Sequence, residues 1–431
     1  MIGSPPLKVL VYFLHNPWPS RSGAHQRCLQ VLRGLRTAGC EVVFASAALH
    51  TEQRWTQESE EALRKITHGE VWVFNGPSRL GRLVDRVERK VRHWLSGESQ
   101  LERTLSCPYS LIRWFRTLVE RVNPDVIIVN YSWFDQLISH KAWRHRHRVI
   151  DTHDLVSLNQ KLRSLAAAQI ERCAKDGTAS ELREKFTSAR SALSIDPEEL
   201  EIFRRYDTVI AISRTEMAAL GPLNSANIIY LPFVSEPSRF SKSSYAGPPL
   251  LSLGPNPFNI QGYLYFLDAV LPRIRSEVPG FKLVVTGVPG SVPRLAAEID
   301  WRGFVKDRSA IFDHAGYSIC PVFGGTGQQI KIVEAMAHGL AMVVFQEAAE
   351  ASFVRHEENG FVARSAQEFA GYVVLLERDG KLRRRMGRAA MATIAEEHEK
   401  HEALPTLIQR LRSPQGPTEC SLYARAESNA N

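Results

Sequence analysis

The sequence predicts an α/β protein with two Rossmann-like domains, each built on a doubly wound parallel sheet. Short apolar runs rich in β-branched residues alternate with helical patterns, as expected for strands that are buried on both faces and joined by crossover helices. This alternation occurs twice, and a segment rich in proline separates the two rounds. The length of 431 residues suits two domains.

The first round predicts an N-terminal domain over residues 1–230. It opens with a strand over 8–14, a loop over 15–23 and a helix from about Ala24 to Ala38, which Gly39 ends. Later strands are expected over 41–48, 71–74, 125–130, 149–151 and 208–213. Two segments do not follow the alternation: residues 78–121 are helical and basic, and residues 155–206 form a helical excursion.

The second round predicts a C-terminal domain over residues 250–412, which follows a linker over 231–249. Strands are expected over 250–254, 282–287, 317–322 and 342–345, with helices over 262–275 and 292–298. The tail over 413–431 is rich in polar and small residues, so we expect it to be disordered.

Composition and charge exclude several protein classes. Apolar residues make up 44% and charged residues 23%, which excludes a mainly disordered chain and a polytopic membrane protein. No run of 18 apolar residues could span a membrane, and the apolar run near the N-terminus does not resemble a signal peptide. The six cysteines are scattered, which favours a reduced, cytoplasmic protein. The net charge of +8 favours anionic partners without choosing among them.

The most informative motif lies over residues 320–339. A strand ends near Val322, and Gly324 and Gly325 allow backbone to approach a ligand closely. Thr326 and Gln329 match a capping box at the start of a helix that runs to about His338. A strand, a glycine-rich turn and a helix N-terminus together form a phosphate site.

Two charged side chains follow on the same helix. Lys331 is placed to bring a positive charge to a diphosphate, and Glu334 to accept hydrogen bonds from the hydroxyls of a ribose. The alternative is an ordinary α/β crossover in which Lys331 and Glu334 form a weak surface ion pair.

The chain resembles family 4 of the GT-B glycosyltransferases, the glycosyl transferases group 1. The resemblance extends over most of the chain and rests on Ser22-Gly23, the segment 151–154, residues 208–216, 254–259 and 303–305, and the motif over 321–339. It implies two facing Rossmann-like domains with a nucleotide-sugar in the cleft between them. It also implies a retaining, metal-independent transfer of a hexosyl or related group from that donor to an acceptor hydroxyl.

The sequence departs from the family pattern at three places. Glu334 matches the second glutamate of the Glu-x7-Glu signature, but Thr326 stands where the first would be, as in a subgroup with Gly-Gly-Thr. The basic pair after the first C-terminal strand is replaced by Asn256, Asn259 and Gln261. The usual hinge sequence is also missing, since residues 231–234 read Leu-Pro-Phe-Val.

The resemblance assigns the site residues. His153, Lys331 and Glu334 are expected to be catalytic. The donor site is expected to use Ser22, Gly23, Asn256, Gly303, Phe304, Val305, Gly324, Gly325, Thr326, Gly327 and Gln328, together with Lys331 and Glu334. We expect no metal and no cofactor beyond the nucleotide-diphosphate sugar as co-substrate, since the sequence has no Asp-x-Asp triplet.

Several alternatives remain for individual side chains. If His153 is not catalytic, it is a histidine whose ring forms hydrogen bonds within its own loop, or a metal ligand together with Asp151 and Asp154. Asn16, Trp18 and Arg21 are candidates for the acceptor side of the cleft.

The basic segment over 79–116 suggests how an acceptor could be reached. Basic residues interleave with apolar ones at helical spacing over 79–92, so docking on an anionic membrane to reach a lipid-linked acceptor is one interpretation. The other is a helix packed on its sheet with a solvated basic face. The protein would then be cytoplasmic, either in solution or peripheral on the inner face of the membrane.

Three competing functions stay open at this point. A catalytically weak nucleotide or sugar binder on the same scaffold is suggested by Thr326 and by the missing basic pair. A sugar-nucleotide epimerase of the same fold is an enzymatic alternative, and its product would form without an acceptor. A nucleic-acid binder is suggested by the net charge alone, and no recognised DNA or RNA motif supports it.

Overall fold

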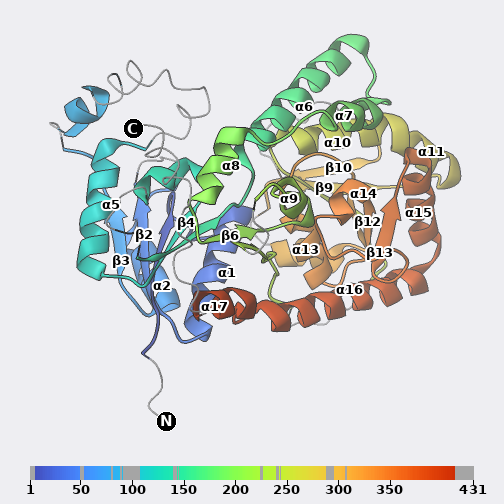
Figure 1. Cartoon of the computed structure of the whole chain (residues 1–431). Coiled ribbons are helices and arrows are strands. Elements are labelled where there is room, and N and C mark those ends of the chain that lie inside the picture. The colour runs from blue at the N-terminus through green and yellow to red at the C-terminus, as the bar shows by residue number, and fades with distance from the viewer. Residues whose placement is uncertain are drawn as a thin grey trace.

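The computed structural model describes residues 5–48, 53–78, 81–87, 90, 107–138, 143, 145–223, 227–238, 242, 244–287, 296–305 and 308–412. The chain folds around two parallel sheets, each flanked by helices, as Figure 1 shows.

The N-terminal sheet has seven strands in the order β3-β2-β1-β4-β5-β6-β7. All neighbours are parallel; Val9, for example, aligns with Val42 on one side and with Val126 on the other. Six strands fall where the sequence predicts them and β7 was not expected. Their bounds are Lys8–Phe13 (β1), Glu41–Ala47 (β2), Val71–Phe74 (β3), Val126–Asn130 (β4), His147–Asp151 (β5), Thr208–Ala211 (β6) and Ile228–Tyr230 (β7).

Helices cover both faces of this sheet. They are Gly23–Thr37 (α1), Gln57–Thr67 (α2), Tyr109–Val122 (α5), Pro197–Arg204 (α8) and Arg214–Ala219 (α9), with a 3-10 helix over Ser132–Leu137. Between β1 and β4 the strand order reverses, which opens a crevice at the carboxyl ends of these strands.

The C-terminal sheet has six parallel strands in the order β10-β9-β8-β11-β12-β13, with its reversal between β8 and β11. The strands are Leu250–Leu253 (β8), Leu283–Gly287 (β9), Ile299–Gly303 (β10), Ser318–Cys320 (β11), Met342–Phe345 (β12) and Gly360–Ala363 (β13). The helices are Pro257–Tyr265 (α10), Leu271–Glu277 (α11), Arg308–His314 (α12), Ile330–Ala337 (α13), Gln346–Ala349 (α14), Ala366–Arg378 (α15) and Gly380–His401 (α16), and a π-helical turn over Phe266–Val270 joins α10 to α11.

Two helix predictions in this domain need correction. The helix expected from 262 begins at Pro257, because the Asn256 side chain accepts a hydrogen bond from the Asn259 N–H at 2.9 Å and caps α10. Of the helix expected over 292–298, residues 292–295 lie outside the described residues, and the remainder forms a turn before β10.

The helical excursion of the N-terminal domain packs on the C-terminal domain. Helices α6 (Val156–Asp176) and α7 (Leu182–Arg190) reach across to α10, as Figure 1 shows. Phe186 of α7 lies edge-on to Phe258 and Phe323, and the Arg183 guanidinium pairs with Glu347 at 2.9 Å. The two halves therefore share apolar core, and α6 and α7 fix their relative position.

The chain also crosses back at its C-terminal end. Helix α17 (Pro405–Arg412) packs with Leu404 and Leu407 among the apolar side chains of β1 and α1, although the sequence places residues up to 412 in the C-terminal domain. Gly34 allows this approach, because a Cβ there would lie 2.4 Å from Leu404 Cγ.

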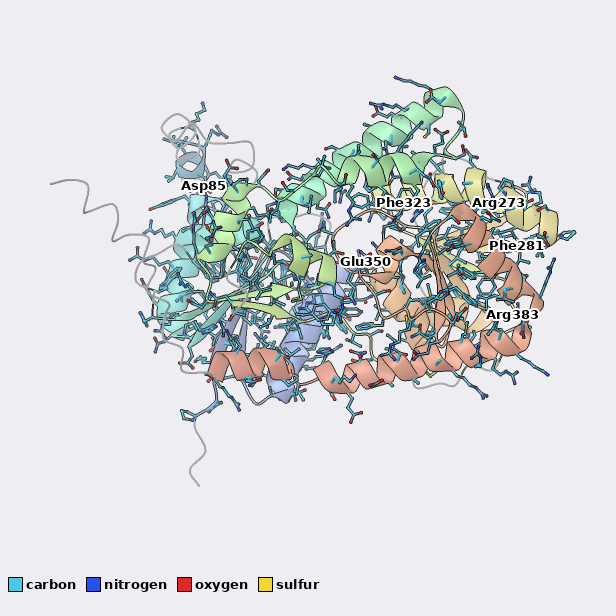
Figure 2. The ribbon with its side chains drawn as sticks, turned by 45° about the vertical axis from the view of Figure 1, so that its right-hand side comes forward. Asp85, Arg273, Phe281, Phe323, Glu350 and Arg383 are labelled. Atoms are coloured by element: carbon cyan, nitrogen blue, oxygen red, sulfur yellow. The ribbon has the colours of Figure 1, made fainter. Side chains whose placement is uncertain are left out.

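The basic segment has two differently arranged parts among the described residues. Its second part belongs to α5, whose Leu111 and Phe115 are buried in the core, as expected for a helix packed on its sheet. Its first part does not match that expectation. Residues 81–87 are helical, and Leu83, Val84 and Val87 are 56%, 49% and 53% exposed. The buried side chain of this turn is Asp85, labelled in Figure 2, which accepts hydrogen bonds from the N–H and Oγ of Ser110. Residues 88–89 and 91–106 lie outside the described residues. No helix in the described part of the chain is long and apolar enough to cross a membrane.

A buried ion pair fixes α1 in the fold. Arg27 Nε donates to Asp151 Oδ2 at 3.0 Å, and the two side chains are 2% and 1% exposed. Arg27 Nη1 also donates to the carbonyl of Pro232 at 3.1 Å. One guanidinium therefore joins α1, the end of β5 and the start of the linker.

Replacing Arg27 with Met should destabilise the protein by about 3–5 kcal/mol, because Asp151 would be left as an uncompensated buried charge. Urea denaturation measures this loss. Arg33→Met is the matched control, since the pair of Arg33 with Glu236 is about half exposed and should contribute at most about 1 kcal/mol. Equal losses in the two variants would contradict a structural role for the buried pair.

Candidate active site

A cleft of about 730 Å³ lies between the two sheets, at the carboxyl ends of their strands. It is lined from both domains, and it gathers every expected site residue except Gly303 and Gly324. Gly324 packs beneath the cleft, where a Cβ would lie 2.4 Å from Phe258 Cδ1. The structure therefore brings together residues that are up to about three hundred positions apart in the sequence.

Two helix N-termini meet across this cleft. Helix α1 begins at Gly23 with Ser22 as its cap, and the Ser22 Oγ accepts from the His25 N–H. Helix α13 of the other domain begins at Ile330, whose Cδ1 would lie 2.5 Å from a Cβ at position 23. The absence of a side chain at Gly23 thus leaves room for this close approach. The partial positive ends of both helices adjoin one space, which favours an anion there.

The capping box expected at Thr326 and Gln329 is wrong. Helix α13 begins four residues after Thr326, and its N-cap Gln329 makes no side-chain capping hydrogen bond. The Thr326 hydroxyl instead donates to Asp154 Oδ1 of the N-terminal domain. The Thr326 carbonyl accepts from Ser213 Oγ at 2.7 Å. The glycine-rich turn is therefore held by contacts between the domains, not by local capping.

Lys331 and Glu334 have separate partners, in contrast to the surface ion pair considered above. Lys331 Nζ donates to Asn259 Oδ1, and burial lowers the pKa of Lys331. Glu334 is 8% exposed, and its Oε1 accepts from Gln26 Nε2 of α1 at 2.8 Å. Both side chains line the cleft, one turn apart on α13.

Gln328 connects the motif to the linker. Its Oε1 accepts from the Phe233 N–H at 2.7 Å, and its Nε2 donates to the Phe233 carbonyl at 3.1 Å. The side-chain amide thus pairs with the linker backbone as a neighbouring strand would. Gln328 lines the cleft, but this amide positions the linker.

His153 lies at the floor of the cleft in an aromatic stack. Its ring lies 4.6 Å from the ring of Tyr131, which also stacks on Trp133. Its Nε2 is 2.5 Å from Asn130 Oδ1, and Asn130 Nδ2 donates to the Tyr12 carbonyl. Nε2 therefore carries the proton and Nδ1 is the acceptor in the neutral ring. Burial lowers the pKa of His153 to about 4, so the ring is neutral at pH 7.

The backbone around His153 is strained. His153 has a φ of 53° and Tyr131 a φ of 67°, and neither is glycine. Such strain concentrates at functional sites, where surrounding contacts hold the backbone in place. Here the stacked rings and the Asn130 hydrogen bond supply those contacts.

The alternative of a metal site at Asp151, His153 and Asp154 finds no support in the geometry. Asp151 pairs with Arg27, His153 bonds to Asn130, and Asp154 accepts from Thr326 and Asn159. Within the described ranges, no group of three or more His, Cys, Asp or Glu side chains could hold a metal ion.

The far end of the cleft is apolar and open. Phe304 is 66% exposed and lines the cleft beside Val305 and Phe312. Gly303, with a φ of 62°, turns the chain at the end of β10 and so places Phe304 at the rim. A flat ring that is exposed at the edge of a cleft can stack on a planar ligand.

Among the candidates for the acceptor side, only Arg21 lines this cleft. Asn16 is 1% exposed; its Nδ2 donates to the Arg54 carbonyl and its Oδ1 accepts from the Trp18 N–H, so it supports its own loop. Trp18 lines a neighbouring hollow between α1 and the linker.

Sequence reasoning missed Arg27, Asn130, Tyr131, Arg163 and Glu216, all of which lie in or directly beneath the cleft. Asn130 and Tyr131 follow the strand expected over 125–130. Because the carboxyl ends of parallel strands meet at one edge of a sheet, their position was a usable signal.

Glu216 is the most strongly perturbed carboxyl near the cleft. Its Oε2 accepts from Thr152 Oγ1 at 2.8 Å and from the Ile212 N–H at 2.9 Å. Burial, followed by the charge of Asp154, raises the pKa of Glu216 to about 8. The carboxyl is therefore mainly protonated at pH 7. The nearby Asp154 carboxyl also has its pKa raised by burial, to about 6.

The raised pKa of Glu216 makes stability depend on pH. Its contribution is complete below the unfolded pKa of about 4.5 and is lost as the pH rises through about 8. The variant Glu216→Gln keeps the neutral form at every pH. We therefore expect wild type to lose at least about 1 kcal/mol relative to this variant between pH 6 and pH 9 in urea unfolding.

Glu198→Gln is the control for this prediction, because Glu198 is exposed on α8. Its stability difference from wild type should stay constant over the same pH range. A constant difference for Glu216→Gln as well would contradict a buried carboxyl that ionises only above neutral pH.

Comparisons with known proteins agree with this architecture. Residues 247–379 match the family model for glycosyl transferases group 1. No curated protein matches the chain in sequence.

Solved structures match over nearly the whole chain. Sucrose-phosphate synthase from Thermosynechococcus elongatus has 13% identity and a TM-score of 0.58, covering 98% of this chain and 99% of its own. A glycosyltransferase from Rickettsia africae has 11% identity and a TM-score of 0.61, with coverages of 95% and 98%. HepE from Anabaena, solved with UDP and glucose, has 15% identity and a TM-score of 0.56, with coverages of 91% and 98%. The chain therefore has the GT-B fold, two facing Rossmann-like domains, and its C-terminal domain is similar to glycosyl transferases group 1.

Proposed function

We propose that the protein is a glycosyltransferase that moves a sugar from a nucleotide-diphosphate sugar to an acceptor hydroxyl. The observation that carries the proposal is the meeting of two helix N-termini, α1 and α13, at one cleft between the domains. A diphosphate that is bound without a metal ion can have its negative charge compensated by helix N-termini of this kind. The family match over residues 247–379 supports the same reaction class.

The leaving group of this reaction is a nucleoside diphosphate, on which negative charge grows as the glycosidic bond breaks. Backbone N–H groups of the turn over 325–327 and of the start of α1 supply preorganised dipoles for that charge. Lys331 adds a full positive charge. Burial lowers the pKa of Lys331, and a bound diphosphate would raise it, because a negative charge beside the ammonium favours the protonated form.

The remaining groups of the donor extend in two directions from the diphosphate. Glu334 would exchange its bond to Gln26 for hydrogen bonds from the ribose hydroxyls. Phe304 and Val305 would flank the nucleobase at the open end of the cleft. In the opposite direction lies the neutral His153, whose Nδ1 can accept from a sugar hydroxyl. The HepE structure contains UDP and glucose, which supports a uridine nucleotide and a hexose as the first donor to test.

Two further features belong to the proposal. Transfer would be metal-independent, because helix dipoles and Lys331 meet the diphosphate charge. It would retain the anomeric configuration, as the resemblance to family 4 implies. Thr326 would serve in place of the first glutamate of the Glu-x7-Glu signature, and its hydroxyl bond to Asp154 would keep a carboxylate at the sugar end of the cleft.

The Thr326–Asp154 contact also favours a second candidate, a nucleotide-sugar binder that does not transfer the sugar. The Thr326 hydroxyl donates its hydrogen bond to Asp154 across the domains, so neither group needs a donor sugar as its hydrogen-bond partner. Donor binding without hydrolysis or transfer would select this candidate.

A thermal-shift panel of UDP-, GDP-, ADP-, dTDP- and CDP-sugars without metal tests the donor site. A ligand at a hundredfold excess over its dissociation constant stabilises the folded state by about 2.7 kcal/mol. We expect a shift with one nucleotide, and loss of that shift in Lys331→Ala and Glu334→Ala. Lys175→Ala and Glu198→Ala are matched controls on exposed helix faces and should keep it. No shift with any donor, or equal loss in the controls, would contradict the proposal.

The acceptor side of the proposal includes contact with an anionic membrane through residues 81–87. This short helix exposes Leu83, Val84 and Val87 together with Arg82 and Arg86. Exposed apolar side chains flanked by arginines suit the interface of an anionic bilayer, where a lipid-linked acceptor would lie. The protein would then be cytoplasmic and peripheral to the membrane.

Flotation with phosphatidylglycerol vesicles at low salt tests this contact. Wild type should float with the vesicles, and Arg82→Glu with Arg86→Glu should remove most of the bound fraction. Arg172→Glu with Lys175→Glu makes the same charge change on α6 and should leave binding intact. Absence of wild-type binding at low salt would overturn membrane contact without affecting the donor site.

A further inference from the structure

A second hollow lies on the C-terminal domain, away from the candidate active site. It has a volume of about 970 Å³ and lies where α16 begins, beside the end of α15 and the linker residues 244–246. We call it the basic recess and define it by Tyr245, Arg378, Lys381, Arg384, Arg385 and Arg388. Figure 2 shows the neighbouring Arg383 at the end of the C-terminal domain that is remote from the N-terminal domain.

The charges of the basic recess are poorly compensated. Across the part of the chain that the structure describes, Lys381, Arg384, Arg385 and Arg388 form no ion pair with a carboxylate. Arg378 pairs with Glu277 at 2.9 Å. The carboxylate that lines the hollow, Asp379, is engaged in capping, since its Oδ1 accepts from the Lys381 and Leu382 N–H groups at 2.9 Å.

This concentration of positive charge is unfavourable unless an anion is bound. Lys381 with Arg385, and Arg384 with Arg388, are like charges at i,i+4 spacing on one helix. Lys381 also lies in the first turn of the 22-residue helix α16, where the helix dipole disfavours positive charge. A bound anion would offset this unfavourable concentration of positive charge.

The hollow is part of the fold and not merely a helix surface. Tyr245 of the linker is 7% exposed and packs on α16 at Gly387, where a Cβ would lie 2.5 Å from Tyr245 Cε1. Gly387 thus lets the linker lie against the helix at a position between Arg384 and Arg388. The wall of the basic recess is therefore fixed, while its cations remain exposed.

We propose that the basic recess binds a ligand carrying two or more phosphate groups. Guanidinium groups bind phosphate oxygens in a bidentate manner, and several of them in one hollow match several phosphates better than a single carboxylate. A volume of about 970 Å³ is at the upper end of the range of small-molecule sites. The phosphates belong either to a free metabolite or to a lipid headgroup. The site is separate from the donor cleft, so it does not depend on the proposed glycosyl transfer.

The position of this site connects it to both domains. Its wall is the linker that joins them, and α16 continues into α17, which packs on the N-terminal domain. A ligand held between the linker and α16 would therefore contact two elements that connect the N-terminal and C-terminal domains.

Isothermal titration of the full chain with inorganic tripolyphosphate tests the site. We expect binding that weakens at least about tenfold in Arg384→Gln with Arg388→Gln, since each lost arginine removes charge-assisted hydrogen bonds. Arg172→Gln with Lys175→Gln removes two exposed charges from α6 and should leave the affinity unchanged. Lys331→Ala, in the donor cleft, should also retain this binding. Equal melting temperatures confirm that the variants fold.

A second arm distinguishes the sources of phosphate. Vesicles of phosphatidylcholine with phosphatidic acid are compared with vesicles of phosphatidylcholine alone. Both vesicle types are tested with the Arg82→Glu, Arg86→Glu variant as the parent, so that the contact proposed for residues 81–87 does not contribute. In that parent, flotation that Arg384→Gln with Arg388→Gln removes identifies a lipid headgroup, and tripolyphosphate binding without flotation identifies a free metabolite. Binding that is unchanged in the Arg384 and Arg388 variant, lost equally in the α6 control, lost in Lys331→Ala alone, or absent in both arms would overturn the proposal.

Discussion

The buried contact between Arg27 and Asp151 is the interaction on which the site depends most. It joins α1, which carries Ser22, Gly23 and Gln26, to the end of β5, which leads into His153 and Asp154. The same guanidinium holds the linker at Pro232. A buried pair of this kind adds little net stability over an apolar core, but the loss of one partner is costly. It therefore fixes geometry, and the geometry it fixes is the N-terminal half of the cleft.

Contacts between the domains position the C-terminal half of the cleft against this N-terminal half. Gly23 abuts Ile330, Thr326 bonds to Asp154 and Ser213, and Gln26 bonds to Glu334. These contacts bring two helix N-termini to one space, and α6 and α7 hold the domains together at the far side. The proposed diphosphate site rests on this convergence, because each helix end contributes only about half a positive charge.

The sequence predicted the central strands of both sheets, because the alternation of apolar runs and helical patterns is a local signal. It missed β7, β10 and β13, each of which lies at the edge of its sheet. It also predicted Lys331 and Glu334 in the cleft from their spacing after a glycine-rich turn. It could not predict that Thr326 would bond to Asp154 instead of capping α13, since that bond joins residues 172 positions apart. For the same reason Arg27 was read as one more residue of a helix. Helical spacing also predicted an apolar face at residues 83–87, but Asp85 is the buried side chain there because Ser110 offers it two donors.

A crystal structure of the protein with its donor nucleotide tests the central claim most directly. The account predicts that diphosphate oxygens lie within hydrogen-bond distance of backbone N–H groups from both domains, at Gly23 and at residues 325–327, with Lys331 Nζ in contact. It also predicts that the ribose hydroxyls replace Gln26 as the partner of Glu334. A diphosphate that contacts only one domain, or that lies outside this cleft, would contradict the claim that the two facing helix ends form the donor site.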